Sequence, residues 1–164
     1  MSSLRDLMLA PPPLTLAVAE SLTSGHLQAR IGVIPGASHF FRGGVTAYSL
    51  DAKNRLLGVA PALAEPVNGV SAEVAAAMAR GAAQLFNTDL ALATTGYAEP
   101  SSAHDAPHPF AWYALVDRRA AGGENVVRTE RIDCPGLDRV AVQQRIADAA
   151  LASLVAYLRG LRGA

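Results

Sequence analysis

The chain has 164 residues, of which 51% are apolar and 17% charged, and its fourteen basic residues balance fourteen acidic ones. This length and composition favour one well-packed domain over residues 1–164, and the lack of a basic excess argues against nucleic acid or an anionic membrane surface as a partner. The single cysteine, Cys134, excludes internal disulfides and zinc sites built on cysteine pairs. Because no apolar run approaches the roughly 20 residues of a bilayer span, we expect a soluble, cytoplasmic protein.

Apolar periodicity and turn signals predict the elements in chain order. The N-terminal part is expected to have a short helix over 1–10, a stiff all-proline connection over 11–13, a strand over 14–20 and a helix over 24–34. A strand over 40–49, a helix over 51–57, a loop over 59–70 and a helix from 71 to 85 follow. The C-terminal part is expected to have a strand over 89–95, a loop over 97–109, strands over 110–117 and 126–133, and a long helix over 137–161. This order predicts an α/β fold, a three-layer sandwich with a mixed β-sheet and helices on both faces.

Local signals support several of these elements. Gly43 and Gly44 lie inside the second predicted strand, where glycine indicates a bulge or a close backbone approach. Ser71 is a typical N-cap for the helix that follows it. Gly122 and Gly123 predict the turn of a hairpin that joins two strands near the C-terminus. The alanine-rich helices and the low charge fraction also favour a surface covered by another subunit, so we expect a homodimer or a higher homo-oligomer.

The polar turn after the first strand is the first candidate site. Glu20, Ser21, Thr23, Ser24 and Gly25 place hydroxyl and backbone N–H groups at the carboxyl end of the predicted sheet, where open α/β sheets hold ligands. The N-terminus of the next helix would favour an anionic group there. The simpler alternative is that one of the three hydroxyls only caps this helix.

Several familiar chemistries have no support in the sequence. There is no Walker loop, no GxGxxG motif after a strand and no HExxH motif. His104 and His108 are close in sequence, but they lie in a proline-rich segment that favours a solvated loop over a metal site. Phe110, Trp112 and Tyr113 favour packing within the sheet over a stacking platform for bases. We therefore expect neither a metal nor a cofactor.

Ser21, Tyr48 and Lys53 remain as a candidate catalytic set. Ser21 and Tyr48 end two strands that can be neighbours, and Lys53 opens the next helix. A serine hydroxyl needs a base before it can attack, and a lysine serves as that base only if burial or a nearby cation lowers its pKa. A tyrosine could relay the proton, and backbone N–H groups around 23–25 could stabilise an oxyanion. The alternative is an exposed helix lysine and a tyrosine that packs at a strand end.

The same residues carry a resemblance to the C-terminal domain of CinA proteins, the family of nicotinamide mononucleotide deamidases also called PncC. AESLTSGHL at 19–27 is similar to the family's AESCTGGL. The resemblance continues through VIPGASHFFRGGVTAYSLDAKNRLLGV at 33–59, GVSAEVAAAMARGA at 69–82 and DLALATTG at 89–96, and it ends at 136–143, which is similar to the family's GDR…R segment. It covers nearly the whole chain, so the combination is specific.

The resemblance implies hydrolysis of the carboxamide of nicotinamide mononucleotide, with nicotinate mononucleotide and ammonia as products and no metal. Ser21 matches the family's nucleophile, Lys53 the base that activates it, and Tyr48 an assisting group. The substrate-binding positions that it implies are Glu20, Thr23, Ser24, Gly25, Thr95, Gly96 and Arg139. Because some family members carry a second, N-terminal domain that is not seen here, the chain resembles the stand-alone form.

The chain also departs from the family pattern. Tyr97 begins a segment, TGYAEPSSAHDAPHPFAWYAL, where the family has a glycine-rich TGIAGPGGG loop, and Glu99 falls where a glycine is expected. Glutamate and proline do not allow the close backbone approach that glycine does, and a carboxylate there disfavours a phosphate. Gln143 replaces the second arginine of GDR…R, which Arg145 could or could not replace. The alternative function is therefore a catalytically silent paralogue, a binding or interaction module with an altered ligand loop over 97–109.

Overall fold

The computed structural model describes residues 3–119 and 126–163. Its five-stranded sheet has the order β2-β1-β3-β4-β5. β1 pairs in parallel with β2 and β3, and β4 pairs antiparallel with β3 and β5. The strands are β1 (Leu16–Glu20), β2 (Phe41–Thr46), β3 (Leu90–Tyr97), β4 (Phe110–Asp117) and β5 (Val126–Asp133). The predicted mixed sheet is confirmed.

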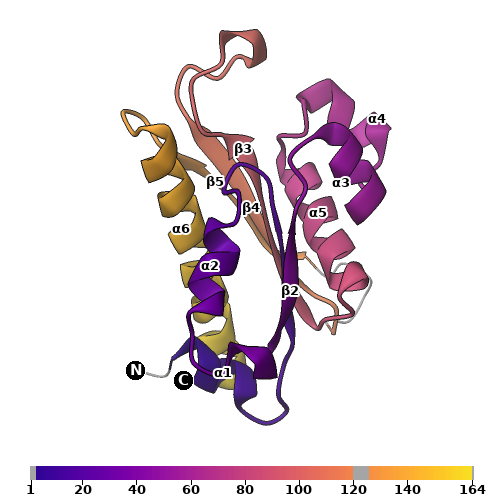
Figure 1. Ribbon diagram of the computed structural model, residues 1–164, viewed down its shortest axis with the longest axis vertical. Coiled ribbons are helices and arrows are strands. Elements are labelled where there is room, and N and C mark those ends of the chain that lie inside the picture. Colours follow the sequence, from indigo (N-terminus) through magenta and orange to yellow (C-terminus); the bar gives the residue numbers. More distant parts are fainter. Residues whose placement is uncertain (1–2, 120–125, 164) are drawn as a thin grey trace.

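Helices cover both faces of this sheet, as the three-layer prediction required (Figure 1). One layer holds α1 (Leu4–Leu9), α2 (His26–Gly32) and the long α6 (Arg139–Arg162). The other holds α3 (Leu50–Leu57), α4 (Pro61–Ala64) and α5 (Ala72–Leu85). The loop between β3 and β4 extends beyond the end of the sheet, at the top of Figure 1.

The two central strands, β1 and β3, alternate large and small side chains. Leu16 and Val18 of β1 pack toward α1, α2 and α6 with Leu90 and Leu92 of β3. The intervening alanines face α5, whose own buried residues are mostly alanine. Small side chains on both surfaces let α5 lie close to the sheet, while the leucines fill the wider space on the other face. Both strands are therefore buried on both faces, as predicted.

Three local predictions are modified by the structure. The expected loop over 59–70 contains α4 and a 3-10 turn at Glu65–Val67. Pro61 is compatible with a helix because it lies in the first turn, where a missing N–H costs no hydrogen bond. The second strand ends at Thr46 rather than at residue 49. The apolar periodicity of the helices expected over 71–85 and 137–161 includes Leu85 and Val140, but these side chains are 52% and 54% exposed.

Two glycine predictions have different outcomes. The register between β1 and β2 shifts next to Gly43, and a Cβ on this residue would lie 2.7 Å from Cε1 of Phe86. The expected bulge with close approach is therefore confirmed. The hairpin turn expected at Gly122 and Gly123 lies outside the described residues.

Ser71 caps α5 as predicted, because its side chain accepts a hydrogen bond from the N–H of Val74 at 3.1 Å. Across 3–119 and 126–163, no helix combines the length and apolarity needed to cross a membrane.

Candidate active site

The parallel pairing of β1 with its neighbours fixes the position of Ser21. The N–H of Ser21 donates to the carbonyl of Thr94 on β3 at 3.0 Å, just past the last residue of β1. On the other side, the N–H of Ala47 donates to the carbonyl of Glu20 at 2.9 Å, just past the end of β2. The segment that follows β2 is thereby brought to the same end of the sheet as Ser21, which is where the sequence predicted a site.

Glu20 organises the turn that carries Ser21. Its side chain is fully buried, and its carboxylate accepts hydrogen bonds from the N–H groups of Gly25 (3.0 Å), Leu27 (3.0 Å) and Gln28 (2.8 Å). The carboxylate of Glu20 therefore caps α2, and the alternative of a hydroxyl cap is wrong because the N-cap residue is Gly25, which makes no side-chain hydrogen bond. Both oxygens of Glu20 are engaged by the backbone, so in this geometry the residue positions Ser21 and leaves no free helix N-terminus for an external anion.

The free backbone N–H groups close to Ser21 lie slightly earlier in the chain than the oxyanion donors expected over 23–25. The N–H of Ser24 donates to the carbonyl of Ser21 at 3.1 Å, and that of Gly25 is taken by Glu20. Within the described part of the chain, the N–H groups of Leu22 and Thr23 donate to no protein acceptor. Of the expected segment over 23–25, Ser24 and Gly25 have their N–H groups engaged, so the candidate oxyanion donors are Leu22 and Thr23, which directly follow the candidate nucleophile.

Lys53 is the only lysine in the chain, and it is buried beside Ser21. Ser49 caps α3 by accepting from the N–H of Ala52 at 3.1 Å, which starts the helix so that Lys53 lies in its first turn. Its Nζ is 2.9 Å from Oγ of Ser21, 3.0 Å from the carbonyl oxygen of Ala47 and 3.1 Å from that of Tyr48. With 3% of Lys53 exposed, the alternative of a solvated helix lysine is wrong.

Burial lowers the pKa of Lys53 from its ordinary 10.5 to about 8. The three partners are neutral groups, so no nearby carboxylate offsets the cost of burying the ammonium. A neutral amine has two N–H groups and one lone pair. The two carbonyls can accept both N–H groups, which leaves the lone pair to accept the hydroxyl proton of Ser21. The geometry therefore suits a lysine that acts as a base.

Tyr48 occupies a different position from the other two candidates. Its carbonyl contacts Lys53, but its phenol side chain is 58% exposed, so it lies at the mouth of the site. The pKa of Arg139 is raised, mainly by its hydrogen bond with Glu99 and to a smaller extent by its interaction with Tyr48. The side chain of Tyr48 therefore links the pocket to Arg139.

A pocket of about 220 Å³ brings most of these residues together. It is lined by Ser21, Tyr48, Ser49, Leu50, Lys53, Asn68, Val70, Thr95, Gly96 and Tyr97. The sequence pointed to five of them as site residues and to Tyr97 as the start of the altered loop, but it missed Ser49, Leu50, Asn68 and Val70. The only signal near Asn68 and Val70 was the Asn68-Gly69 turn dipeptide. Gly69 has a φ of +71°, and a Cβ there would lie 3.4 Å from Cδ and Cε of Lys53. Thr95 donates to the carbonyl of Gly69 at 2.6 Å, so this predicted binding residue also holds the backbone beside Lys53.

A second hollow of about 440 Å³ shares Asn68, Val70 and Tyr97 with this pocket. The loop that departs from the family pattern forms part of its wall. The rings of Tyr97 and His104 are stacked with centroids 5.4 Å apart, and Asn68 Nδ2 lies 3.0 Å from Nε2 of His104. The loop therefore has its own packing and extends the surface next to Ser21.

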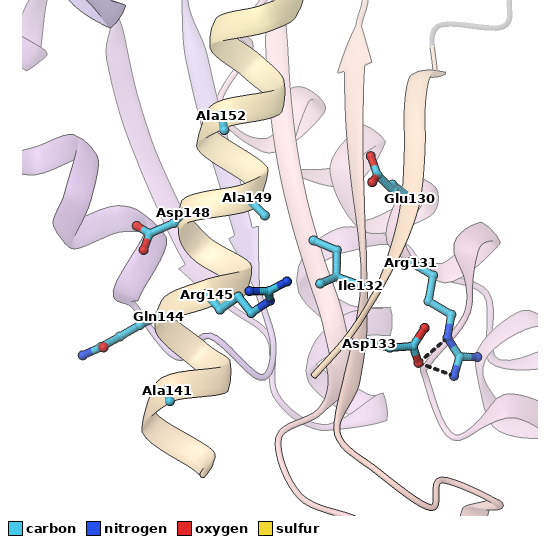
Figure 2. A pocket seen from close by; sticks show the side chains of 10 residues that line it. All are labelled: Glu130, Arg131, Ile132, Asp133, Ala141, Gln144, Arg145, Asp148, Ala149 and Ala152. Atoms are coloured by element: carbon cyan, nitrogen blue, oxygen red, sulfur yellow. Dashed lines mark hydrogen bonds and ion pairs between the residues drawn. The ribbon is translucent and has the colours of Figure 1, made fainter. Parts of the chain in front are cut away.

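The structure shows what Gln143 does at the second arginine position of the family motif and where Arg145 lies. Gln143 donates to the carbonyl of Leu22 at 2.8 Å, so the residue at the second arginine position supports the turn after Ser21. Arg145 instead lines a hollow of about 870 Å³ between β5 and α6, where it projects toward the strand beside Ile132 (Figure 2). None of Ser21, Tyr48 and Lys53 lines that hollow. Arg145 therefore does not substitute for the missing arginine.

Comparison with known proteins identifies the family. The model of the CinA C-terminal domain matches residues 4–158. The chain belongs to this family. A CinA-like protein of Geobacter metallireducens is 49% identical over 106 residues, which cover 64% of this chain and 26% of that protein. A CinA-like protein of Chlorobium limicola is 38% identical over 157 residues, 95% of this chain and 36% of that protein.

Solved structures agree with this CinA assignment. The competence damage-inducible protein A of Klebsiella pneumoniae superposes with a TM-score of 0.81 at 28% identity, over 92% of this chain and 88% of that one. A CinA superfamily protein of Enterobacter cloacae gives 0.81 at 27% identity, over 96% and 98%. The chain thus spans only 26% and 36% of the two CinA-like proteins named above, but nearly all of this second structure.

Proposed function

We propose that this CinA domain is an amidohydrolase that converts nicotinamide mononucleotide to nicotinate mononucleotide and ammonia. The observation that carries the proposal is the 2.9 Å contact between Nζ of the only lysine and Oγ of Ser21, in a buried setting that lowers the pKa of Lys53 to about 8. A lysine is otherwise seldom buried without a charged partner, because desolvation of the ammonium is costly. Membership of the CinA family and the match of Ser21, Tyr48 and Lys53 to its motif support the same chemistry.

In the proposed reaction, neutral Lys53 takes the hydroxyl proton as Oγ of Ser21 attacks the carboxamide carbon. The N–H groups of Leu22 and Thr23 would hold the oxyanion that forms. The protonated Lys53 then gives its proton to the amide nitrogen, the C–N bond breaks, and ammonia leaves with an ester remaining on Ser21. A water molecule, deprotonated by Lys53, attacks this ester to release the nicotinate carboxylate and restore the serine hydroxyl. Tyr48 would border the substrate at the pocket mouth.

The test is ammonia release from nicotinamide mononucleotide by the purified chain. Ser21→Ala and Lys53→Ala should each abolish turnover while circular dichroism shows that both remain folded. Ser153→Ala is the matched control, because Ser153 is a buried serine on α6 outside this pocket and should keep its activity. Undiminished turnover in the Lys53 variant would contradict the proposal.

A second candidate function is a binding or interaction module without catalysis. The observation that favours it is Arg139, whose guanidinium is held by Glu99 in the loop that differs from the family. Calorimetry with pyridine nucleotides separates the two candidates when it is combined with the turnover assay. Binding without ammonia release would favour the module, whereas Ser21-dependent release would exclude it.

We further propose that the domain acts in the cytoplasm and assembles as a homodimer or higher homo-oligomer. Leu85, Val140 and Leu161 are among the apolar side chains left exposed on its helices. Light scattering after size-exclusion chromatography should give a mass of at least twice 17.0 kDa. A species of the monomer mass would contradict the oligomer.

A further inference from the structure

Arg139 is a cation next to the mouth of the pocket, and one edge of its guanidinium is already occupied by Glu99. It is the first residue of α6, directly after the N-cap Asp138. Its Nε lies 3.0 Å from one carboxylate oxygen of Glu99, and its terminal nitrogen lies 2.8 Å from the other. Two parallel N–H···O contacts of this kind are the geometry in which a guanidinium binds either a carboxylate or a phosphate. Tyr48 connects this pair to the pocket, since it lines the pocket and interacts with Arg139 closely enough to help raise its pKa.

No arginine among the described residues lines the walls of the site. Among the described residues that line the hollows of about 220 and 440 Å³, Lys53 is the one lysine or arginine, and all of its N–H groups have partners inside the site. A phosphate attached to a substrate in this pocket would therefore have to displace Glu99 from Arg139 or lie beside a carboxylate of like charge. Either alternative weakens binding of the phosphate.

The loop that carries Glu99 is tied down by its own contacts. Ser101 and Ala106 exchange two backbone hydrogen bonds, of 2.8 and 2.9 Å, which close the loop just beyond Glu99. The stacked rings of Tyr97 and His104 fix its base. The hydrogen bond from Arg139 lowers the pKa of Glu99, so the carboxylate is ionised at neutral pH. The ion pair is thus supported by a packed loop.

We propose that Glu99 is a specificity-determining residue that takes the place of a substrate phosphate on Arg139, so that the chain favours unphosphorylated carboxamides such as nicotinamide riboside over the nucleotide. The inference rests on the proposed hydrolysis at Ser21 and shifts its preferred substrate from the nucleotide to the unphosphorylated nucleoside. Glu99, which stands where a glycine is expected from the family resemblance, would then act on ligand choice directly through its charge.

The experiment compares kcat/KM for nicotinamide mononucleotide and nicotinamide riboside. Glu99→Gln keeps the size of the side chain and removes its charge, so the nucleotide-to-riboside ratio should rise about two- to fivefold, as expected for one partly exposed charge contact. Adding Arg139→Gln to this variant should remove the gain. Asp148→Asn is the matched control, because Asp148 is also an exposed carboxylate paired with an arginine, Arg30, about 13 Å farther along α6. It should leave the ratio unchanged.

Ser21-dependent turnover with the same ratio in the parent chain and in Glu99→Gln would overturn this inference while leaving the proposed function intact. If no protein releases ammonia from either compound, the proposed function fails, and calorimetry on the Ser21→Ala background decides the inference. Tighter binding of the nucleotide alone on adding Glu99→Gln would support it. Unchanged affinities, or no binding of either compound, would overturn it.

Discussion

Replacement of Lys53 by methionine should change the stability of the chain in a pH-dependent way. Methionine fills a similar volume without a charge, so the variant removes the buried titration and keeps the packing. The pKa of Lys53 falls from 10.5 to about 8 on burial. Between these two values the unfolded chain holds a proton that the folded chain has released. Because stability rises with pH wherever the unfolded state binds more protons, the parent chain should gain stability relative to the variant from pH 8 to 10.5.

The size of this gain follows from the shift itself. A difference of about 2.5 pKa units corresponds to about 3 kcal/mol at about 1.4 kcal/mol per unit. At pH 7 the buried ammonium therefore lowers the stability of the parent chain by about 3 kcal/mol relative to the variant. The variant in turn loses the hydrogen bonds that Lys53 donates to the carbonyls of Ala47 and Tyr48, which reduces this difference. That loss does not depend on pH, so it moves the whole difference curve without changing its slope.

Urea unfolding of both proteins at pH 7, 8, 9 and 10 measures the difference curve. Lys53 is the only lysine, so no other lysine titrates in either protein, and the tyrosines contribute equally to both. Lysine labelled with ¹³C at the ε position gives a direct check, since the folded chain should show one side-chain signal that titrates near pH 8. A flat difference curve together with a titration midpoint near 10.5 would refute the assignment of Lys53 as a base whose pKa is lowered to about 8 by burial.

Three further predictions concern the same site. kcat/KM for amide hydrolysis should rise with pH up to about 8 and then level off, because Lys53 acts as a base only when deprotonated; a rate independent of pH over 6–9 would contradict this role. Glu20→Gln should destabilise the fold by about 2–4 kcal/mol in thermal or chemical unfolding, since an amide cannot accept all three backbone N–H groups that the carboxylate accepts. The exposed substitution Glu73→Gln is the control, and a smaller loss of stability in Glu20→Gln than in this control would show that the cap is dispensable. Gly69→Ala should cost about 1–2 kcal/mol and lower kcat, because φ is +71° there and the added Cβ would lie 3.0 Å from Leu50; unchanged unfolding and activity would mean that the segment moves freely.

The sequence determined the elements, the fold class and the residue types of the candidate site. Continuous apolar runs predicted β1 and β3 because a strand covered on both faces has no polar positions, and the structure places both in the interior of the sheet, away from its edges. Ser71 and its acidic first turn predicted the start of α5 from local hydrogen bonding alone. The motif around Ser21 and Lys53 identified the CinA family, as the family match confirms.

Only the tertiary structure decided what surrounds each of these residues. Whether Lys53 is buried depends on β1 and β2 being neighbours and on Gly69 covering the amine, and these contacts join segments far apart in the sequence. Glu20 carried no local sign that it would cap α2, because its three partners lie five to eight residues away across a turn. Glu99 and Arg139 are 40 residues apart, and their pairing depends on the path of the β3–β4 loop. Local patterns fix backbone elements, whereas the burial and partners of a charged side chain follow from long-range packing.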